Sequence, residues 1–300
     1  MADSTSVSSA LATLGVNGWV PTNDPRYAGM ANLWQSTWAN RPLTGTIAVG
    51  QQLLVTDVGL APGSMFVWDG TRWRPANGLA LLAQLATPTI LPSSGSSNAS
   101  GLITMTTAIG YTLGSGQACA IYLPAGVVTA GSQGSGAGVY QATGLGTNNT
   151  VQISGTGIVT ANGAYTQTTA SALNLTSVSV PASLMGVNGS LRARSVLSAP
   201  NGTGTKTPSL AFGGSQFRNL TMGPTAISGG MVGVLHNRGS QAVQIAPDQY
   251  DSQTEGAFAT NAVVRLAIDT SAAQTLAFQG TLTNAADYLI LESYTVELLA

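Results

Sequence analysis

The sequence predicts a mainly-β protein of tandem antiparallel β-sandwich, jelly-roll-like domains, with a small β-hairpin module and an extended, partly helical N-terminal anchor. Segments rich in Val, Ile, Thr and Tyr are short, and Gly, Ser or Asn residues separate them. Many short strands with frequent turn signals are typical of a sandwich or barrel. At about 100–200 residues per domain, a chain of 300 residues is expected to contain more than one domain.

Charge is scarce and unevenly distributed, and this marks the predicted boundaries. Charged residues make up 7% of the chain, against about 25% in a typical soluble domain. Residues 75–191 contain no Asp, Glu, Lys or Arg, and all five tryptophans precede them. The predicted units are an anchor segment (1–43), a small β module (44–79), an uncharged β-sandwich domain (80–180) and a C-terminal β-sandwich domain (181–300).

The uncharged segment indicates assembly. Soluble monomers normally carry charges of both signs on their surface. We therefore expect residues 80–180 to pack against other copies of the chain or against a larger particle. The alternative is a monomer whose surface is kept soluble by Ser, Thr and Asn side chains.

The anchor segment is rich in aromatic residues. Residues 28–39 have the three- and four-residue apolar spacing of a helix, which would place Trp34 and Trp38 on one face. Together with Trp19, these side chains have little surrounding chain in which to be buried. Two alternatives stay open for them: packing against the next domain of this chain, or docking onto a partner.

Residues 44–79 contain a strong hairpin signal. Two strand-like segments flank Asp69-Gly70, a dipeptide typical of tight hairpin turns. The run Val55-Thr56-Asp57-Val58-Gly59, followed by Phe66 to Pro75, resembles a small module of tail fibres and other structural proteins of tailed bacteriophages. That resemblance implies a virion protein.

The remaining strands follow from β-branched and aromatic content. In the uncharged domain the predicted strands are Leu102–Thr106, Ala118–Leu123, Gly126–Ala130, Val139–Ala142, Val151–Ser154 and Leu173–Val180. In the C-terminal domain they are Ser190–Leu197, Val232–Leu235, Ala242–Ile245, Ala262–Ile268, Gln274–Phe278 and Tyr288–Leu298. In the first of these, Leu191 and Ala193 fall on one face, while Arg192 and Arg194 fall on the other.

The C-terminal domain carries the second resemblance. The segments Gly189–Arg194, Ala267–Ser271 and Asn284–Leu298 together resemble a jelly-roll-like β-sandwich of phage tail and head appendages. The resemblance implies a homotrimer that is located in the virion, assembles in the host cytoplasm and contacts other virion proteins of tail or capsid.

Reactive chemistry is sparse. The single histidine, His236, has no nucleophile signature beside it and is interpreted as a turn or strand-end residue. The single cysteine, Cys119, allows no intramolecular disulfide and is interpreted as a small buried hydrophobe. Asp248, Asp251 and Glu255 offer oxygen ligands, but their spacing does not match an EF-hand, so a solvated loop is expected and cation binding is left open.

No cofactor or metal ion is expected, and the balance of 10 bases against 11 acids gives no basic surface for nucleic acid. We also expect no membrane partner, because the chain has no secretory signal and no apolar run of about 18 residues.

The expected function is that of a non-enzymatic structural protein of a tailed phage, a tail-fibre or head-fibre subunit. Trp19, Trp34 and Trp38 are its candidate docking residues. One alternative is a carbohydrate-binding receptor-recognition protein that contacts a host surface glycan. A second is a capsid decoration (cement) protein. A sugar hydrolase is disfavoured because paired carboxylates are scarce.

Overall fold

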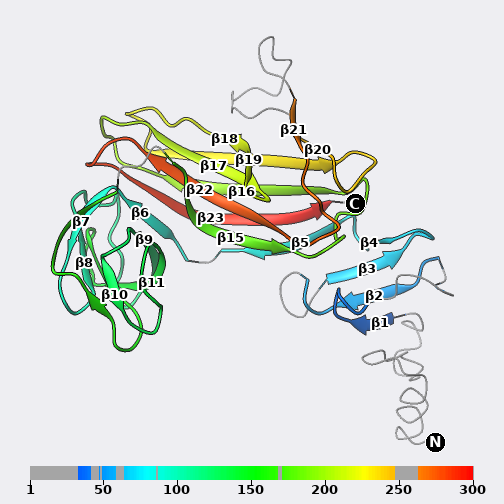
Figure 1. The fold of residues 1–300 in the computed structure, drawn as a ribbon, viewed down its shortest axis with the longest axis horizontal. Coiled ribbons are helices and arrows are strands. Elements are labelled where there is room, and N and C mark those ends of the chain that lie inside the picture. Colours follow the sequence, from blue (N-terminus) through cyan, green and yellow to red (C-terminus); the bar gives the residue numbers. More distant parts are fainter. Residues whose placement is uncertain are drawn as a thin grey trace, which may run out of the picture.

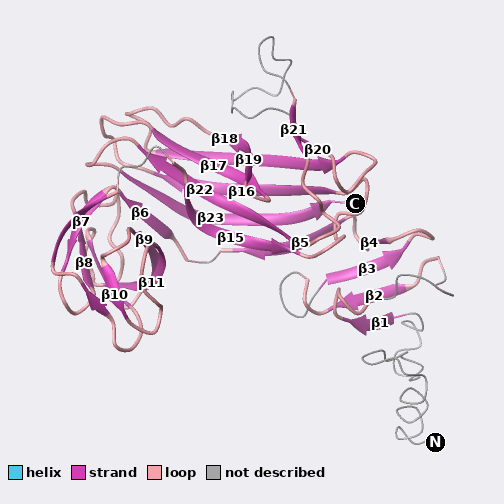
Figure 2. Cartoon of the chain, viewed as in Figure 1, coloured by secondary structure: helices cyan, strands magenta, loops and turns pink. Residues whose placement is uncertain are grey.

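The computed structural model describes residues 33–41, 47, 49–58, 64–85, 87–167, 171–246 and 263–299. All regular elements among these residues are β-strands, which confirms the mainly-β class (Figure 2). Figure 1 shows three units: a small unit and a middle unit lie at opposite ends of a larger C-terminal sandwich. The helix predicted over residues 28–39 is wrong for Leu33–Ser36, which form a strand. Residues 1–32 lie outside the described residues.

The small unit is a four-stranded sheet. Its strands, in order across the sheet, are β1 (Leu33–Ser36), β2 (Gln52–Val55), β3 (Ser64–Trp68) and β4 (Trp73–Pro75). The predicted hairpin at Asp69-Gly70 is confirmed: β3 and β4 pair antiparallel, and the amide of Asp69 donates to the carbonyl of Arg72 at 3.0 Å. Gly70 has a φ of +100°, a conformation that glycine adopts without steric cost.

The C-terminal sandwich consists of two sheets that enclose one apolar core. One sheet has the order β15 (Leu173–Val180), β22 (Gln274–Leu282), β17 (Lys206–Phe212) and β18 (Ser215–Asn219). The facing sheet contains β5 (Leu79–Gln84), β23 (Tyr288–Leu299), β16 (Ser190–Ser198), β19 (Ser228–Asn237), β20 (Gln244–Ala246) and β21 (Val264–Leu266).

The middle unit continues the second sheet through β6 (Thr89–Pro92), which pairs with β23 on one side and β9 on the other. From β6 onward the strand order is β9 (Ala118–Leu123), β11 (Gly138–Gly144), β12 (Thr150–Ile153), β8 (Leu102–Met105), β7 (Ser94–Ser97) and β14 (Gly163–Thr166). A separate two-stranded sheet contains β10 (Val128–Ala130) and β13 (Val159–Thr160).

Strand pairing places two segments of the predicted 80–180 domain in the C-terminal sandwich. Strand β5 pairs with β23, and β15 pairs with β22 along its whole length. The sequence could not indicate this, because the sheet that a strand joins is decided by backbone partners far away in the chain. We use "middle unit" below for β7 to β14.

Strand β23 contributes to two separate cores. Leu289 and Leu291 belong to the core of the C-terminal sandwich, whereas Tyr288 and Ile290 belong to the core of the middle unit. Successive side chains of a strand point to opposite faces of its sheet. Because its side chains alternate between two faces, β23 supplies residues to both cores and so connects the two units.

Local patterns predicted several side-chain environments correctly. In β16, Leu191 and Ala193 are buried while Arg194 is exposed, as the alternation predicted. Cys119 is fully buried in the core of the middle unit and has no disulfide partner among the described residues, as expected for a small hydrophobe.

Candidate functional site

Trp38 is packed inside its own chain. Its side chain is 3% exposed, and its ring lies tilted against Phe66 with centroids 4.9 Å apart. The indole nitrogen donates a hydrogen bond of 2.9 Å to the carbonyl of Ala182 in the C-terminal sandwich. The guanidinium of Arg41 lies 3.9 Å from the ring centroid, a cation–π contact. These contacts favour the intramolecular alternative, and they leave Trp38 without a free face for docking.

The other two candidate docking residues are not brought together with Trp38. Trp19 lies outside the described residues, and of Trp34 only the backbone, in β1, is described. Trp34 lies in the extended strand β1, so it does not share a helix face with Trp38. The strand replaces the helix because β1 pairs in parallel with β2, a partner nearly twenty residues away that the apolar spacing did not indicate.

A pocket of about 380 Å³ lies at the junction of the small unit and the C-terminal sandwich. We call it the junction pocket. From the small unit it is lined by Trp38, Arg41, Trp68, Thr71, Arg72 and Trp73, and from the sandwich by Ser183, Leu184, Gly186, Val187 and Gln241. Ligand pockets typically measure about 300–1,000 Å³ and combine apolar walls with a few polar groups. Indole, guanidinium and amide groups together give this pocket that character.

Arg41 lines the junction pocket, and Asp69 accepts hydrogen bonds from Thr71 and Arg72, which also line it; the pKa values of Arg41 and Asp69 are both shifted. Desolvation by burial lowers the pKa of Arg41 to about 10, against an opposing effect of Asp57, so this guanidinium is still charged at neutral pH. Burial alone would raise the pKa of Asp69, but hydrogen bonds from Thr71, Arg72 and Arg74 outweigh it and hold that pKa well below its usual range.

Ser183, on the sandwich side of the junction pocket, has a φ of +58° and is the one non-glycine residue with positive φ among those described. Its amide donates a hydrogen bond of 2.7 Å to the carbonyl of Thr270. Such backbone conformations persist where the surroundings over-determine them. The wall of the pocket is therefore fixed by contacts within the sandwich.

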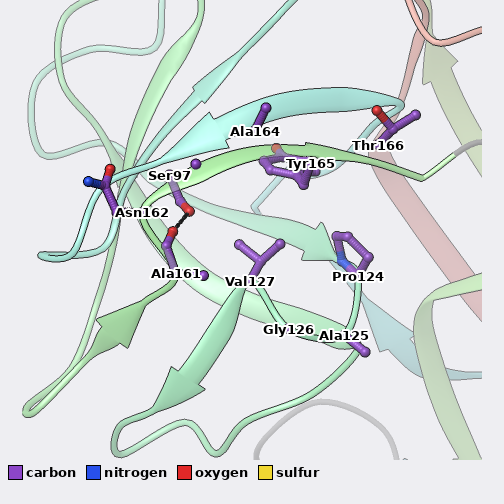
Figure 3. Close-up of a pocket in the computed structure, with 11 residues that line it drawn as sticks. Ser97, Pro124, Ala125, Gly126, Val127, Ala161, Asn162, Ala164, Tyr165 and Thr166 are labelled. Carbon is purple, nitrogen blue, oxygen red and sulfur yellow. Dashed lines mark hydrogen bonds between the residues drawn. The ribbon is translucent and has the colours of Figure 1, made fainter.

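A second pocket, of about 390 Å³, lies in the middle unit (Figure 3). It is lined mainly by Gly, Ala and short polar residues, with Ser97 bonded to the carbonyl of Ala161 across it. Tyr165 is its only titratable lining residue, and burial raises the pKa of that phenol. This pocket therefore has a shape but no group that exchanges protons near neutral pH.

His236 lies in the last part of β19, so the prediction of a strand-end residue is confirmed. Its Nδ1 is 2.6 Å from the hydroxyl oxygen of Ser190, directly opposite on β16. A Ser–His pair acts as a nucleophile when a third group orients the base, and the described residues place no carboxylate on this imidazole. The pair is best explained as a cross-strand hydrogen bond.

Further chemistry is sparse in the part of the chain that the structure describes. No group of three or more His, Cys, Asp or Glu side chains is placed to hold a metal ion there. Nor does any helix there have the length and hydropathy to span a membrane. Asp248, Asp251 and Glu255 lie outside the described residues.

The sequence matches no family model and no curated protein. Among solved structures, one described as "Structure of infectious bursal disease virus Gx strain" aligns with 83% of this chain and 72% of that chain, at 7% identity and a TM-score of 0.13. A TM-score this low does not establish a shared fold.

Proposed function

We propose that this chain is a structural, non-enzymatic subunit of a tailed-phage particle. It assembles as a homotrimer and attaches to tail or head through its N-terminal region. The observation that carries the proposal is the absence of charge over residues 75–191. Most of this stretch forms the middle unit, whose surface presents hydroxyl, amide and apolar groups instead of the charges that a solvated domain normally carries.

Exposed apolar side chains support the same proposal. In the middle unit, Val139, Leu145 and Val159 are 37%, 42% and 47% exposed. On the outer face of the C-terminal sandwich, Val196 and Val232 are about half exposed on the adjacent strands β16 and β19. Uncharged surfaces with apolar side chains lose little solvation when another subunit covers them.

Light scattering after gel filtration tests the assembly. We expect a mass three times the 30.3 kDa of one chain. Replacing Val139, Leu145 and Val159 together by Asp is expected to dissociate the trimer, because each new charge would be buried at the interface without a partner. Val49→Asp, at a 75% exposed position in the small unit, is the matched control. A stable wild-type monomer at micromolar concentration contradicts the proposal.

The position of β1 determines which N-terminal truncation can test attachment. Because β1 pairs with β2 and Trp38 is buried, removing residues 1–43 would damage the small unit. Removing residues 1–32 leaves β1 in place. We expect this truncated chain to trimerise but not to be incorporated when it is supplied during particle assembly. Normal incorporation of the truncated chain would contradict N-terminal docking. If the full chain is instead found all over the capsid surface, the alternative of a decoration protein is favoured.

The junction pocket favours a second candidate function, the binding of a host surface glycan. Guanidinium and amide groups suit the hydroxyl groups of a sugar, and Arg72 and Gln241 line the pocket from opposite units. We expect a glycan microarray to give a specific signal that Arg72→Ala weakens and Arg194→Ala, on the outer sheet face, does not. No signal, or equal loss in both variants, would contradict this candidate.

A further inference from the structure

The chain contains a single lysine, and that lysine is completely buried. The other basic side chains are arginines and His236, so Lys206 supplies the only side-chain amine among 300 residues. It is the first residue of β17 and is 0% exposed. The side chain of Asp287, just before β23, is also 0% exposed, and its Oδ1 lies 3.8 Å from the amine nitrogen.

The contacts of Lys206 hold its amine in a fixed orientation. Nζ donates hydrogen bonds to the carbonyls of Pro200 at 3.0 Å and Pro224 at 2.9 Å. An ammonium group has three N–H bonds. Two are therefore held by carbonyls, and the third is left for the carboxylate of Asp287.

The two carboxylate oxygens of Asp287 differ. Oδ2 accepts a hydrogen bond of 3.1 Å from the backbone amide of Gly204, whereas Oδ1 accepts none from the described residues. An unpaired buried carboxylate oxygen is costly. Oδ1 is thus the atom that can take a proton from Lys206, while the amide of Gly204 is placed as an oxyanion donor at Oδ2.

The loop before β17 closes over the carboxylate. A Cβ atom at Gly202 would lie 2.0 Å from Oδ1, and one at Gly204 would lie 2.4 Å from Oδ2. Any larger residue would force the loop away from Asp287. Glycine at both positions brings the backbone into contact with the carboxylate and excludes water from the pair.

A purely structural ion pair does not explain the choice of lysine. Arginine is generally better suited to buried ion pairs because its planar fork forms paired hydrogen bonds with a carboxylate. A buried ion pair also adds little net stability, because the desolvation penalty offsets the attraction. Lysine differs from arginine in having an amine that acts as a nucleophile once it loses a proton.

We propose that Lys206 and Asp287 condense into an intramolecular amide bond. Nζ transfers one proton to Oδ1, and its freed lone pair attacks Cγ. The tetrahedral intermediate carries its negative charge on Oδ2, beside the amide of Gly204. A second proton from the nitrogen passes to Oδ1, the Cγ–Oδ1 bond breaks, and one water molecule leaves. The only products are an amide and water, so no co-reactant is needed.

The bond would join the two sheets of the C-terminal sandwich. Lys206 begins β17 in one sheet, and Asp287 is followed directly by β23 in the other (Figure 1). A cross-link between positions this far apart in sequence restricts the unfolded chain strongly. We therefore expect the linked protein to melt at a higher temperature than chains in which the bond has not formed.

Mass spectrometry of the full-length protein tests the proposal. The intact mass is expected to be lower than the sequence mass by one water molecule. Trypsin should then release residues 195–218 and 266–300 as one linked species, without cleavage at Lys206. Full sequence mass, with separate peptides 195–206 and 207–218, would overturn the proposal.

Two variants and a labelling measurement locate the bond. Lys206→Arg and Asp287→Ala should each show the full sequence mass of their own chain, whether or not they fold well. In denatured wild-type protein, an amine-reactive reagent should label only the α-amino group, whereas Asp287→Ala should take up a second label. A link from Lys206 to the nearby Asn284, with loss of ammonia, would contradict the assignment.

Discussion

The middle unit and the C-terminal sandwich belong to the same structural class but satisfy their polar groups differently. Both enclose apolar cores between antiparallel strands. The middle unit does so without any charged residue, whereas the sandwich contains the Arg192–Glu297 and Lys206–Asp287 ion pairs. An apolar β-sheet core therefore forms in both units, whether or not the unit contains ion pairs.

In the middle unit, amide side chains bind the backbone where loops would otherwise lack partners. The Oδ1 of Asn98 accepts hydrogen bonds from the backbone amides of Ser100 and Leu102, both at 3.0 Å. Gln133 donates to the carbonyl of Gln141 at 2.9 Å and accepts from its amide at 2.6 Å. Neutral hydrogen bonds to the backbone therefore stabilise this unit without ion pairs.

The largest effect is expected from the sandwich core. Phe212 is fully buried, and Phe212→Ala should lower the free energy of unfolding by about 3–5 kcal/mol, because it removes a large side chain and leaves a cavity. Hydrogen exchange should show whether the middle unit loses protection as well. Full protection there would show that the two units unfold independently, despite sharing β23.

An intermediate effect is expected from the amide network of the middle unit. Gln133→Ala removes hydrogen bonds to the Gln141 backbone and should cost about 0.5–1.5 kcal/mol in denaturant unfolding. Ser135→Ala, at an exposed position in the same loop, should stay within about 0.5 kcal/mol of the wild type. Equal effects of the two substitutions would remove the role assigned to Gln133.

The smallest effect is expected from the partly exposed ion pair of the sandwich. Glu297→Gln breaks the 2.5 Å contact with Arg192 and should cost about 0–1 kcal/mol. Because salt screens exposed charges, the loss should shrink as ionic strength rises. The loss from Gln133→Ala should not change with salt, and a similar salt dependence in both would contradict the contrast between the two units.

Sequence patterns predicted strands where apolar and polar residues alternate clearly. The bounds of β15 were predicted to the residue, and those of β23 to within one residue. Strand β7, with the sequence Ser-Gly-Ser-Ser, is not among the predicted strands, because its residues favour turns. It becomes a strand because β8 and β14 pair with it on both sides and Gly95 leaves room for Tyr165.

The sites were harder to predict because they depend on non-local contacts. Pro208 obscured β17, since proline normally argues against a strand that is paired on both sides. The junction pocket joins residues 38–73 to residues 183–241, which no local pattern relates. Composition does hold one signal for the Lys206–Asp287 pair, namely a lone lysine among arginines.

The shared strand β23 also has a consequence for synthesis. Strands β5 and β6 pair with it, so they leave the ribosome long before their partner exists. At about 5–20 residues per second, the delay between residues 92 and 288 is roughly 10–40 s. During that time the middle unit lacks Tyr288 and Ile290 from its core. Folding of this protein is therefore expected to be completed late, in a single closing step, and not unit by unit as the nascent chain emerges.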